Sequence, residues 1–117
     1  MALKTLGWVG PAMSLDRLSI PEAEPGEVES REVVVTDDVL VKVFALGPGA
    51  ALSPHDHPES TNVFHVLEGT VTVIQGESSE RIRAPGVVLH ERGVEHGARN
   101  DTDDVAVLTA SLCPLPG

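Results

Sequence analysis

Three histidines have the residue type and the spacing that a metal site requires. His55 and His57 are separated by one residue. In an extended strand such side chains point to the same face, so both imidazoles would reach one ion while Asp56 points away. Imidazole suits divalent transition metals. With His96 supplied by a later hairpin, the pattern predicts three ligands on one side of an ion and open positions for water or a substrate.

The residues around the first histidine pair resemble the first motif of the cupin superfamily. Gly49 precedes His55 by the family spacing, His57 follows, and Gly69 closes the motif. The family's glutamate ligand falls on Asn62 in this chain. An amide brings a weak neutral oxygen in place of an anionic one. We therefore expect an ion that is more Lewis acidic and less tightly held.

Asn62 has two interpretations. The resemblance implies a metal ligand or a residue that supports the ligands, and some cupins work with three histidines and no glutamate. The alternative is an interior amide that is hydrogen-bonded to the backbone or to water. Glu59 is the nearest substitute carboxylate, but Pro58 between it and His57 disturbs the strand.

A later segment resembles the second cupin motif. Gly93, His96 and Asn100 hold the family spacing. Glu91 stands at the position of the family's proline, and the gap before Gly93 is one residue short. With the strands expected on either side, the resemblance covers roughly residues 30–110. It implies a barrel whose interior is lined by the two motifs, with the ion inside its mouth.

Strand patterns dominate the chain after its first 30 residues. Residues 1–30 are rich in proline and glutamate and are expected to form an extended arm, whereas residues 31–117 are expected to form a single domain. Short segments rich in Val, Ile, Leu and Thr indicate an all-β antiparallel jelly roll, and the resemblance implies the small double-stranded β-helix barrel of cupins. The eight expected strands cover residues 32–35, 39–46, 62–68, 70–75, 80–83, 86–89, 96–100 and 105–110.

Strand alternation also assigns the other polar side chains near the motifs. With Asn62 and Phe64 facing inward, His65 lies on the outer face and is not a ligand. His90 is expected at the rim of the barrel, and the alternative is a base inside the cavity. Arg99 near the mouth either binds a carboxylate substrate or is a solvated surface charge.

The charge balance argues against two classes of partner. The 117-residue chain has 18 acidic and 8 basic side chains, which give a formal net charge of −10. Nucleic acids and anionic membranes require clustered Lys and Arg, so neither is an expected partner. No stretch approaches the roughly 18 apolar residues of a membrane span, and the first residues lack a secretory pattern, so we expect the protein in the cytoplasm.

Two classes of function follow. In the first, one divalent transition-metal ion, Fe, Mn, Ni, Zn or Cu, makes the chain a metal-dependent enzyme that acts on a small organic molecule. The resemblance implies dioxygenase, isomerase or decarboxylase chemistry, among which we prefer an oxidoreductase. In the second class, the same cup binds or senses a small ligand without turning it over. The apolar-rich arm is expected to reach a second copy, which predicts a homodimer.

Overall fold

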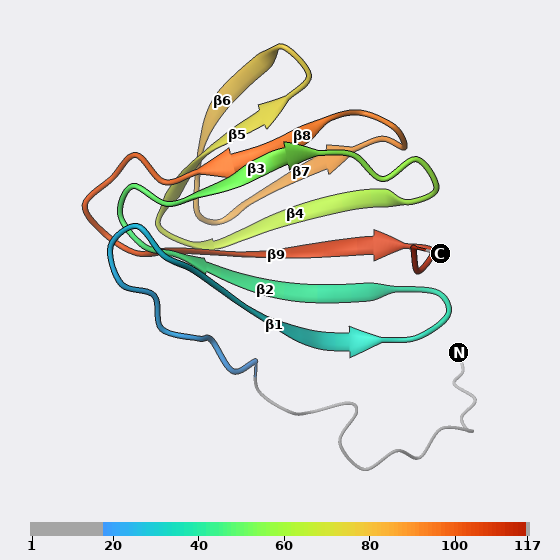
Figure 1. Ribbon diagram of the computed structural model, residues 1–117, viewed down its shortest axis with the longest axis horizontal. Coiled ribbons are helices and arrows are strands. Elements are labelled where there is room, and N and C mark those ends of the chain that lie inside the picture. Colours follow the sequence, from blue (N-terminus) through green and yellow to red (C-terminus); the bar gives the residue numbers. More distant parts are fainter. Residues whose placement is uncertain (1–17, 117) are drawn as a thin grey trace.

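Nine β-strands and no helix make up residues 18–116, the part of the chain that the computed structural model describes (Figure 1). No helix in this range is therefore long and apolar enough to cross a membrane. The strands are β1 (Val28–Val35), β2 (Leu40–Leu46), β3 (Ala51–His55), β4 (Thr61–Glu68), β5 (Thr70–Gln75), β6 (Ser78–Arg83), β7 (Gly86–His90), β8 (His96–Arg99) and β9 (Ala106–Cys113).

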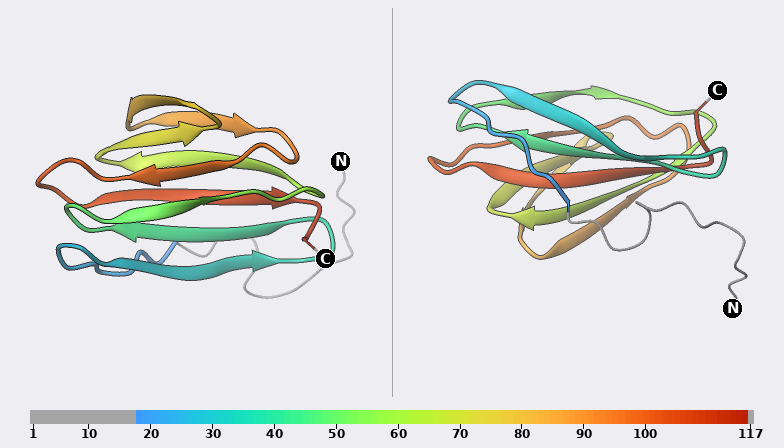
Figure 2. Two further views of the ribbon diagram at one scale, coloured as in Figure 1. Left: turned by 45° about the horizontal axis from the view of Figure 1, so that its top comes forward. Right: turned by 90° about the horizontal axis from the view of Figure 1, so that it is seen from below.

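The strands form two antiparallel sheets that pack through their inner faces. The larger sheet has the order β1-β2-β9-β4-β7, and the smaller has the order β3-β8-β5-β6. Figure 2 shows the two layers from two further sides. Chain neighbours such as β3 and β4 belong to different sheets, so the chain crosses between the layers repeatedly. This all-β jelly roll is the class of fold that the sequence predicted.

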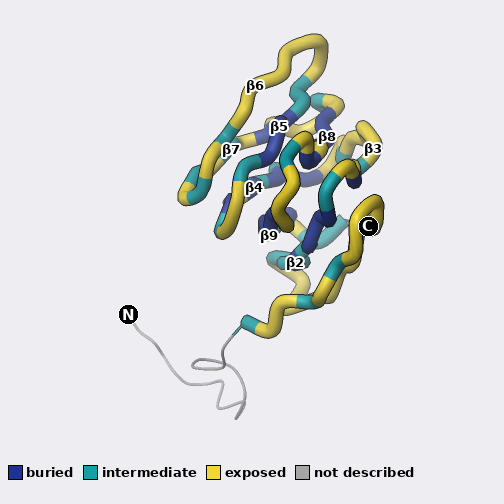
Figure 3. The backbone as a smooth tube through the Cα atoms, turned by 90° about the vertical axis from the view of Figure 1, so that its left-hand side faces the viewer, coloured by how far each residue is buried: buried dark blue, intermediate teal, exposed yellow. Residues whose placement is uncertain are grey.

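Apolar side chains from both sheets fill the space between the layers. Phe64 and Val66 of β4 and Leu108 of β9 meet Val71 and Val73 of β5, and all five are buried. Figure 3 shows buried backbone in the central strands and exposed backbone in the connecting turns. Each large apolar side chain contributes about 1.5–3 kcal/mol on burial. This core fixes the strands that carry the polar residues described below.

Alternation along β4 is as the sequence predicted. Asn62 and Phe64 are buried, and His65 is exposed on the opposite face. In the larger sheet, Asn62 is the direct Cα partner of Leu112 on β9 and of His90 on β7. These partners share the inward face, because directly paired residues in an antiparallel sheet point to the same side.

β3 is a strand that the sequence did not predict as a separate element. Its sequence, Ala-Leu-Ser-Pro-His, lacks β-branched residues, and Pro54 has no backbone N–H to donate. The structure places this strand at the edge of the smaller sheet, where its register against β8 shifts between Leu52 and His55. Pairing with β8, which lies more than 40 residues later in the chain, decides the conformation of this segment.

β1 begins at Val28, within the span expected to form the arm, because it pairs with β2 along its whole length. The rest of that arm is described only from residue 18 onwards. Ser19 lies beside β1, where its hydroxyl accepts a hydrogen bond of 2.7 Å from the Arg31 guanidinium. The expected arm contacts over residues 1–17 lie outside the described residues.

Candidate metal centre

Three histidines meet where β3 ends and β8 begins. His55 is the last residue of β3, His96 is the first of β8, and their Cα atoms are direct partners. The ring centroid of His57 lies 5.0 Å from that of His55 and 5.7 Å from that of His96, and the centroids of His55 and His96 are 4.7 Å apart. One ring nitrogen of each histidine lies within 4.8 Å of the others. The structure therefore brings together the three histidines that the sequence predicted as ligands.

The reason for this proximity differs from the one that the sequence suggested. β3 ends at His55, so strand alternation does not extend to His57. Instead, a loop carries His57 to the cluster, and its carbonyl accepts hydrogen bonds from the backbone N–H groups of Ser60 (3.4 Å) and Gly93 (3.1 Å). The bond to Gly93 connects the first motif to the second. Because β3 ends before His57, the expectation of a continuous strand through both histidines is wrong.

Backbone carbonyls fix the orientation of two of the rings. Nδ1 of His55 donates to the carbonyl of Ser53 (2.8 Å), and Nδ1 of His96 donates to the carbonyl of Val94 (2.9 Å). A carbonyl only accepts, so each Nδ1 carries the hydrogen and each Nε2 keeps its lone pair. This is the tautomer that ligating histidines adopt when a partner holds their other nitrogen.

Burial favours the neutral form of two of the three rings, His57 and His96. Removal from water lowers the pKa of His57, and the neighbouring His55 and His96 lower it further. Burial also lowers the pKa of His96, against an opposing contribution from its hydrogen bond to Val94. Imidazoles with a pKa below 6.5 are neutral near pH 7. The neutral form is the one that binds a metal ion.

Asn62 reaches the cluster through its amide. Its Nδ2 donates a hydrogen bond of 2.8 Å to the Nε2 lone pair of His96, a bond that an ion at this nitrogen would replace, and its Oδ1 is buried without a hydrogen-bond partner among the described residues. An unpaired buried carbonyl oxygen beside three imidazoles is the kind of group that an ion or its bound water would satisfy. The nearest alternative carboxylate, Glu59, is exposed and lies outside the cluster.

The donor set fits a transition-metal ion. Bonds from an ion to imidazole nitrogen are about 2.0–2.1 Å long, which requires ligand atoms closer together than 4.8 Å. His55 is exposed and His57 is half-buried, so both rings have room to turn inward. The buried His96 supplies the fixed side of the cluster.

His90 is a fourth histidine inside the barrel. Its ring is fully buried and stacks on His96 with 4.3 Å between centroids and 9° between planes. Nδ1 accepts a hydrogen bond of 2.9 Å from Nε2 of Gln75, which also donates to the carbonyl of Leu89. The expected rim position is therefore wrong. Because His90 pairs with Asn62 across the two strands, it shares the inward face.

Acid is expected to destabilise the fold through His90. Burial, followed by His96 and His55, lowers the pKa of His90 to about 4. Between pH 6.5 and pH 4 the unfolded chain therefore binds a proton that the folded chain does not. The free energy of unfolding should fall by about 3 kcal/mol across this window. Urea titrations of chelator-treated protein at about pH 7 and about pH 4 measure the change.

The matched variants are His90→Gln and His65→Gln. The first removes the buried titrating ring and should lose less stability in acid than the wild type. The second removes an exposed histidine and should follow the wild type. Equal acid sensitivity of His90→Gln and the wild type would contradict the assignment.

A cavity of about 340 Å³ adjoins the cluster. His55, His57 and Asn62 lie on its wall, together with apolar side chains of β2, β4 and β9. Among the described residues that line the cavity, Lys42 of β2 is the one lysine, arginine or acidic side chain, and the motifs in the sequence did not point to it. The available signal was a lysine within an otherwise apolar strand. A more open hollow of about 760 Å³ beside β6 contains none of the histidines.

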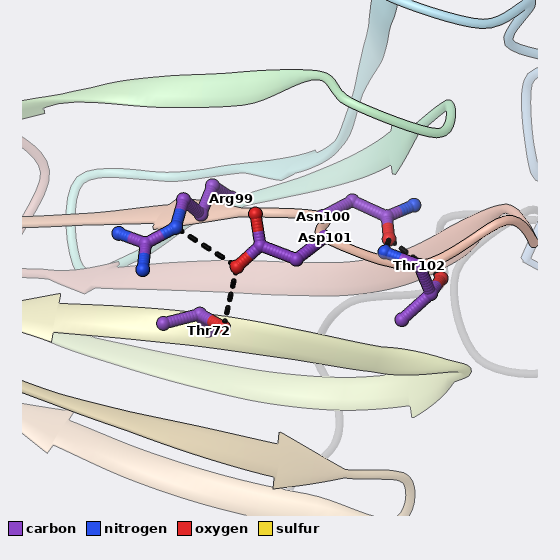
Figure 4. Close-up of polar contacts among 5 residues, drawn as sticks. All are labelled: Thr72, Arg99, Asn100, Asp101 and Thr102. Atoms are coloured by element: carbon purple, nitrogen blue, oxygen red, sulfur yellow. Dashed lines mark hydrogen bonds and ion pairs between the residues drawn. The ribbon is translucent and has the colours of Figure 1, made fainter.

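Arg99 and Asn100 have structural partners (Figure 4). Nε of Arg99 lies 2.9 Å from Oδ2 of Asp101, which also accepts a hydrogen bond from Thr72, so Arg99 is a surface charge that is already paired. Asn100 is fully buried. Its Nδ2 donates to three backbone carbonyls, and its Oδ1 accepts from the N–H and hydroxyl of Thr102. This motif residue therefore holds loops together and does not face the ion site.

A family model described as "Cupin domain" matches residues 42–112. The match spans more than half of the chain and contains all three clustered histidines. Germin-like protein 5-1 of Oryza sativa subsp. japonica is 34% identical over 76 residues, which cover 60% of this chain and 34% of that protein. The chain thus spans about a third of the length of that relative.

Solved structures share the fold along most of the chain. A protein with a double-stranded β-helix domain from Klebsiella pneumoniae subsp. pneumoniae is 24% identical, with a TM-score of 0.77, and the match covers 84% of this chain and 86% of that one. A protein from Thermus thermophilus is 28% identical, with a TM-score of 0.76, and the match covers 81% and 90% of the two chains. The expected double-stranded β-helix is confirmed.

Proposed function

The chain belongs to the cupin domain family, and from this premise we propose that it is a metal-dependent enzyme acting on a small organic molecule. His55, His57 and His96 would bind one divalent Fe, Mn, Ni, Zn or Cu ion. The observation that carries the proposal is the cluster of three imidazoles, two of which keep the hydrogen on Nδ1 and the lone pair on Nε2 because their Nδ1 atoms donate to backbone carbonyls.

The residues around the cluster would prepare a substrate for chemistry at the ion. Such an ion supplies Lewis acidity and open coordination positions for substrate oxygen atoms or dioxygen. Phe64 and Leu112 line the neighbouring cavity and would exclude water from the substrate's apolar part. The unpaired Oδ1 of Asn62 would accept a hydrogen bond from water bound to the ion, or would contact the ion itself. We place the reaction among dioxygenase, isomerase or decarboxylase chemistry.

Turnover tests separate this proposal from its alternative. Chelator-treated protein is reloaded with each of the five ions and incubated with small organic acids, while oxygen uptake and product formation are followed. Ion-dependent turnover that is absent from His96→Ala is expected. If the protein binds ions and acids and turns none over, the enzyme proposal fails and a non-catalytic ligand-binding module replaces it. The neutral Asn62 in place of the family's glutamate is the feature that favours this alternative.

Asn62→Glu is expected to tighten metal binding by about 10-fold, because it adds an anionic oxygen beside Nε2 of His96. Competition with a chromophoric chelator measures the dissociation constant. Asn62→Gln keeps the neutral amide and serves as the control, with no gain expected. An Asn62→Glu protein that binds no tighter than the wild type would place Asn62 outside the ion's reach.

We also propose that two copies pair through the outer face of β7. Val87 and Leu89 are 64% and 53% exposed, and β7 is an edge strand of the larger sheet. Exposed apolar side chains on an edge strand favour association with another sheet. Sedimentation should show a wild-type dimer and a monomer after Val87→Lys with Leu89→Lys. A monomeric wild type at high concentration would end this proposal.

A further inference from the structure

Lys42 is the charged residue of the cavity that the proposed metal site does not use. It occupies the middle of β2, whose other residues are apolar. Leu40 and Phe44 lie two residues to either side and share its face, and all three line the cavity. Lys42 is half-buried. A lysine of this kind covers apolar surface with its methylene stem and keeps its ammonium group where water or an anion can reach it.

No described carboxylate compensates Lys42. Among residues 18–116 there is one ion pair, Arg99–Asp101, and it lies on the smaller sheet, away from Lys42 on the larger one. Glu32 is the Cα partner of Lys42 on β1, but it is exposed and makes no ion pair with it. Instead, Nζ lies 5.4 Å from the centre of the Phe44 ring. This cation–π contact holds the ammonium against the cavity wall.

The strand register places Lys42 at a distance from the histidine cluster that one small molecule can span. Lys42, Ala110 and Phe64 are Cα partners across β2, β9 and β4, and Asn62 is the next inward residue on β4. With strands about 4.8 Å apart and a rise of about 3.3 Å per residue, Asn62 lies roughly 10 Å across the sheet and roughly 7 Å along it. The lysine stem spans part of this separation. Apolar side chains line the cavity between the two polar ends.

The geometry points to Lys42 as the anion-binding residue of the cavity. Its ammonium group binds the carboxylate, or a similar anionic oxygen group, of a substrate whose other end lies at the histidine cluster. This inference rests on the proposed function and narrows its substrate to a small organic acid with a compact apolar body. A cavity of about 340 Å³ accommodates such a molecule. The chain carries a net charge of −10, so a local cation is needed to draw an anion into the cavity.

Sodium benzoate and its neutral analogue benzamide are suitable probes. Calorimetric titrations use wild type, Lys42→Met and Lys42→Arg, each both metal-loaded and chelator-treated. Arg83→Met, which removes an exposed positive charge outside this cavity, controls for the change in net charge. Metal content is measured on every sample. The wild type should bind benzoate better than benzamide. Lys42→Met should lose at least about 10-fold in benzoate affinity, since one charge-assisted contact is removed.

The two remaining variants and the metal content complete the test. Lys42→Arg should retain most of the benzoate affinity, and Arg83→Met should bind like the wild type. Benzoate binding that is unchanged in Lys42→Met, or absent from every wild-type sample, overturns the inference. If the wild type binds benzoate but no metal ion, and Lys42→Met loses the benzoate affinity, the proposed metal enzyme is wrong and the anion site at Lys42 is supported. If the protein holds one metal ion per chain and its benzoate affinity does not depend on Lys42, the anion site is wrong and the proposed metal site is supported.

Discussion

His96→Ala is expected to lower the affinity for a transition-metal ion by more than about 100-fold, since even the loss of a partner outside the ligand shell lowers it by about 10–100-fold. His96 is the buried member of the cluster, and its Nδ1 is fixed by Val94. Competition titrations with Zn²⁺ or Co²⁺ measure the affinity. His55→Ala and His57→Ala should also weaken binding severely.

His65→Ala is the matched control for these variants. His65 lies on the exposed face of β4, between the buried residues Phe64 and Val66, and it is outside the cluster. Its loss should leave the affinity near the wild-type value. If His65→Ala weakens binding as much as His96→Ala does, or if the three cluster variants retain wild-type affinity, the assignment of the site is wrong.

Asn100→Asp is expected to lower the free energy of unfolding by about 4 kcal/mol. The amide Nδ2 donates to the backbone carbonyls of Leu46, Gly47 and Asp104 at 2.8–3.3 Å. A carboxylate has no hydrogen to donate there, so the change buries a negative charge against three carbonyl oxygens. Urea unfolding at neutral pH measures the difference. The expected loss is a large part of the stability of a typical small domain.

Asp103→Asn provides the control for Asn100→Asp. Asp103 is exposed in the same turn, so exchanging its side chain between acid and amide should change the free energy of unfolding by less than about 0.5 kcal/mol. A change below about 1 kcal/mol for Asn100→Asp would mean that the amide does not hold the loops together.

The sequence predicted best where side-chain periodicity and local contacts agree. β4 and β5 are rich in apolar and β-branched residues and are separated by Gly69, and both strands lie within one residue of their expected limits. The inward placement of Asn62 and the outward placement of His65 follow from the same period of two. These features depend on neighbours in the chain, which a single sequence shows directly.

Long-range pairing determined what the sequence did not show. β3 has little strand propensity of its own and is ordered by β8, whereas His57 reaches the cluster through a loop bonded to Gly93. His90 was misplaced because the short gap before Gly93 left its register open. The pairing of His90 with Asn62 across β4 and β7 settles that it faces inward.

Lys42 was overlooked for a different reason. A lysine in an apolar strand is visible in the sequence, but its meaning depends on whether that face of the strand meets solvent or a cavity. Only the arrangement of β2, β4 and β9 shows that the cavity lies on this face. The clustering of the three histidines was predictable because the family spacing encodes it, whereas the surroundings of the cluster required the fold.

The metal content of untagged wild-type protein, measured by plasma mass spectrometry after purification without added metal or chelator, tests the central claim most directly. The account predicts about one equivalent of a divalent transition metal per chain, because one cluster of three histidines provides one site. Protein that contains no such metal and takes up none from solutions of Fe, Mn, Ni, Zn or Cu would contradict it.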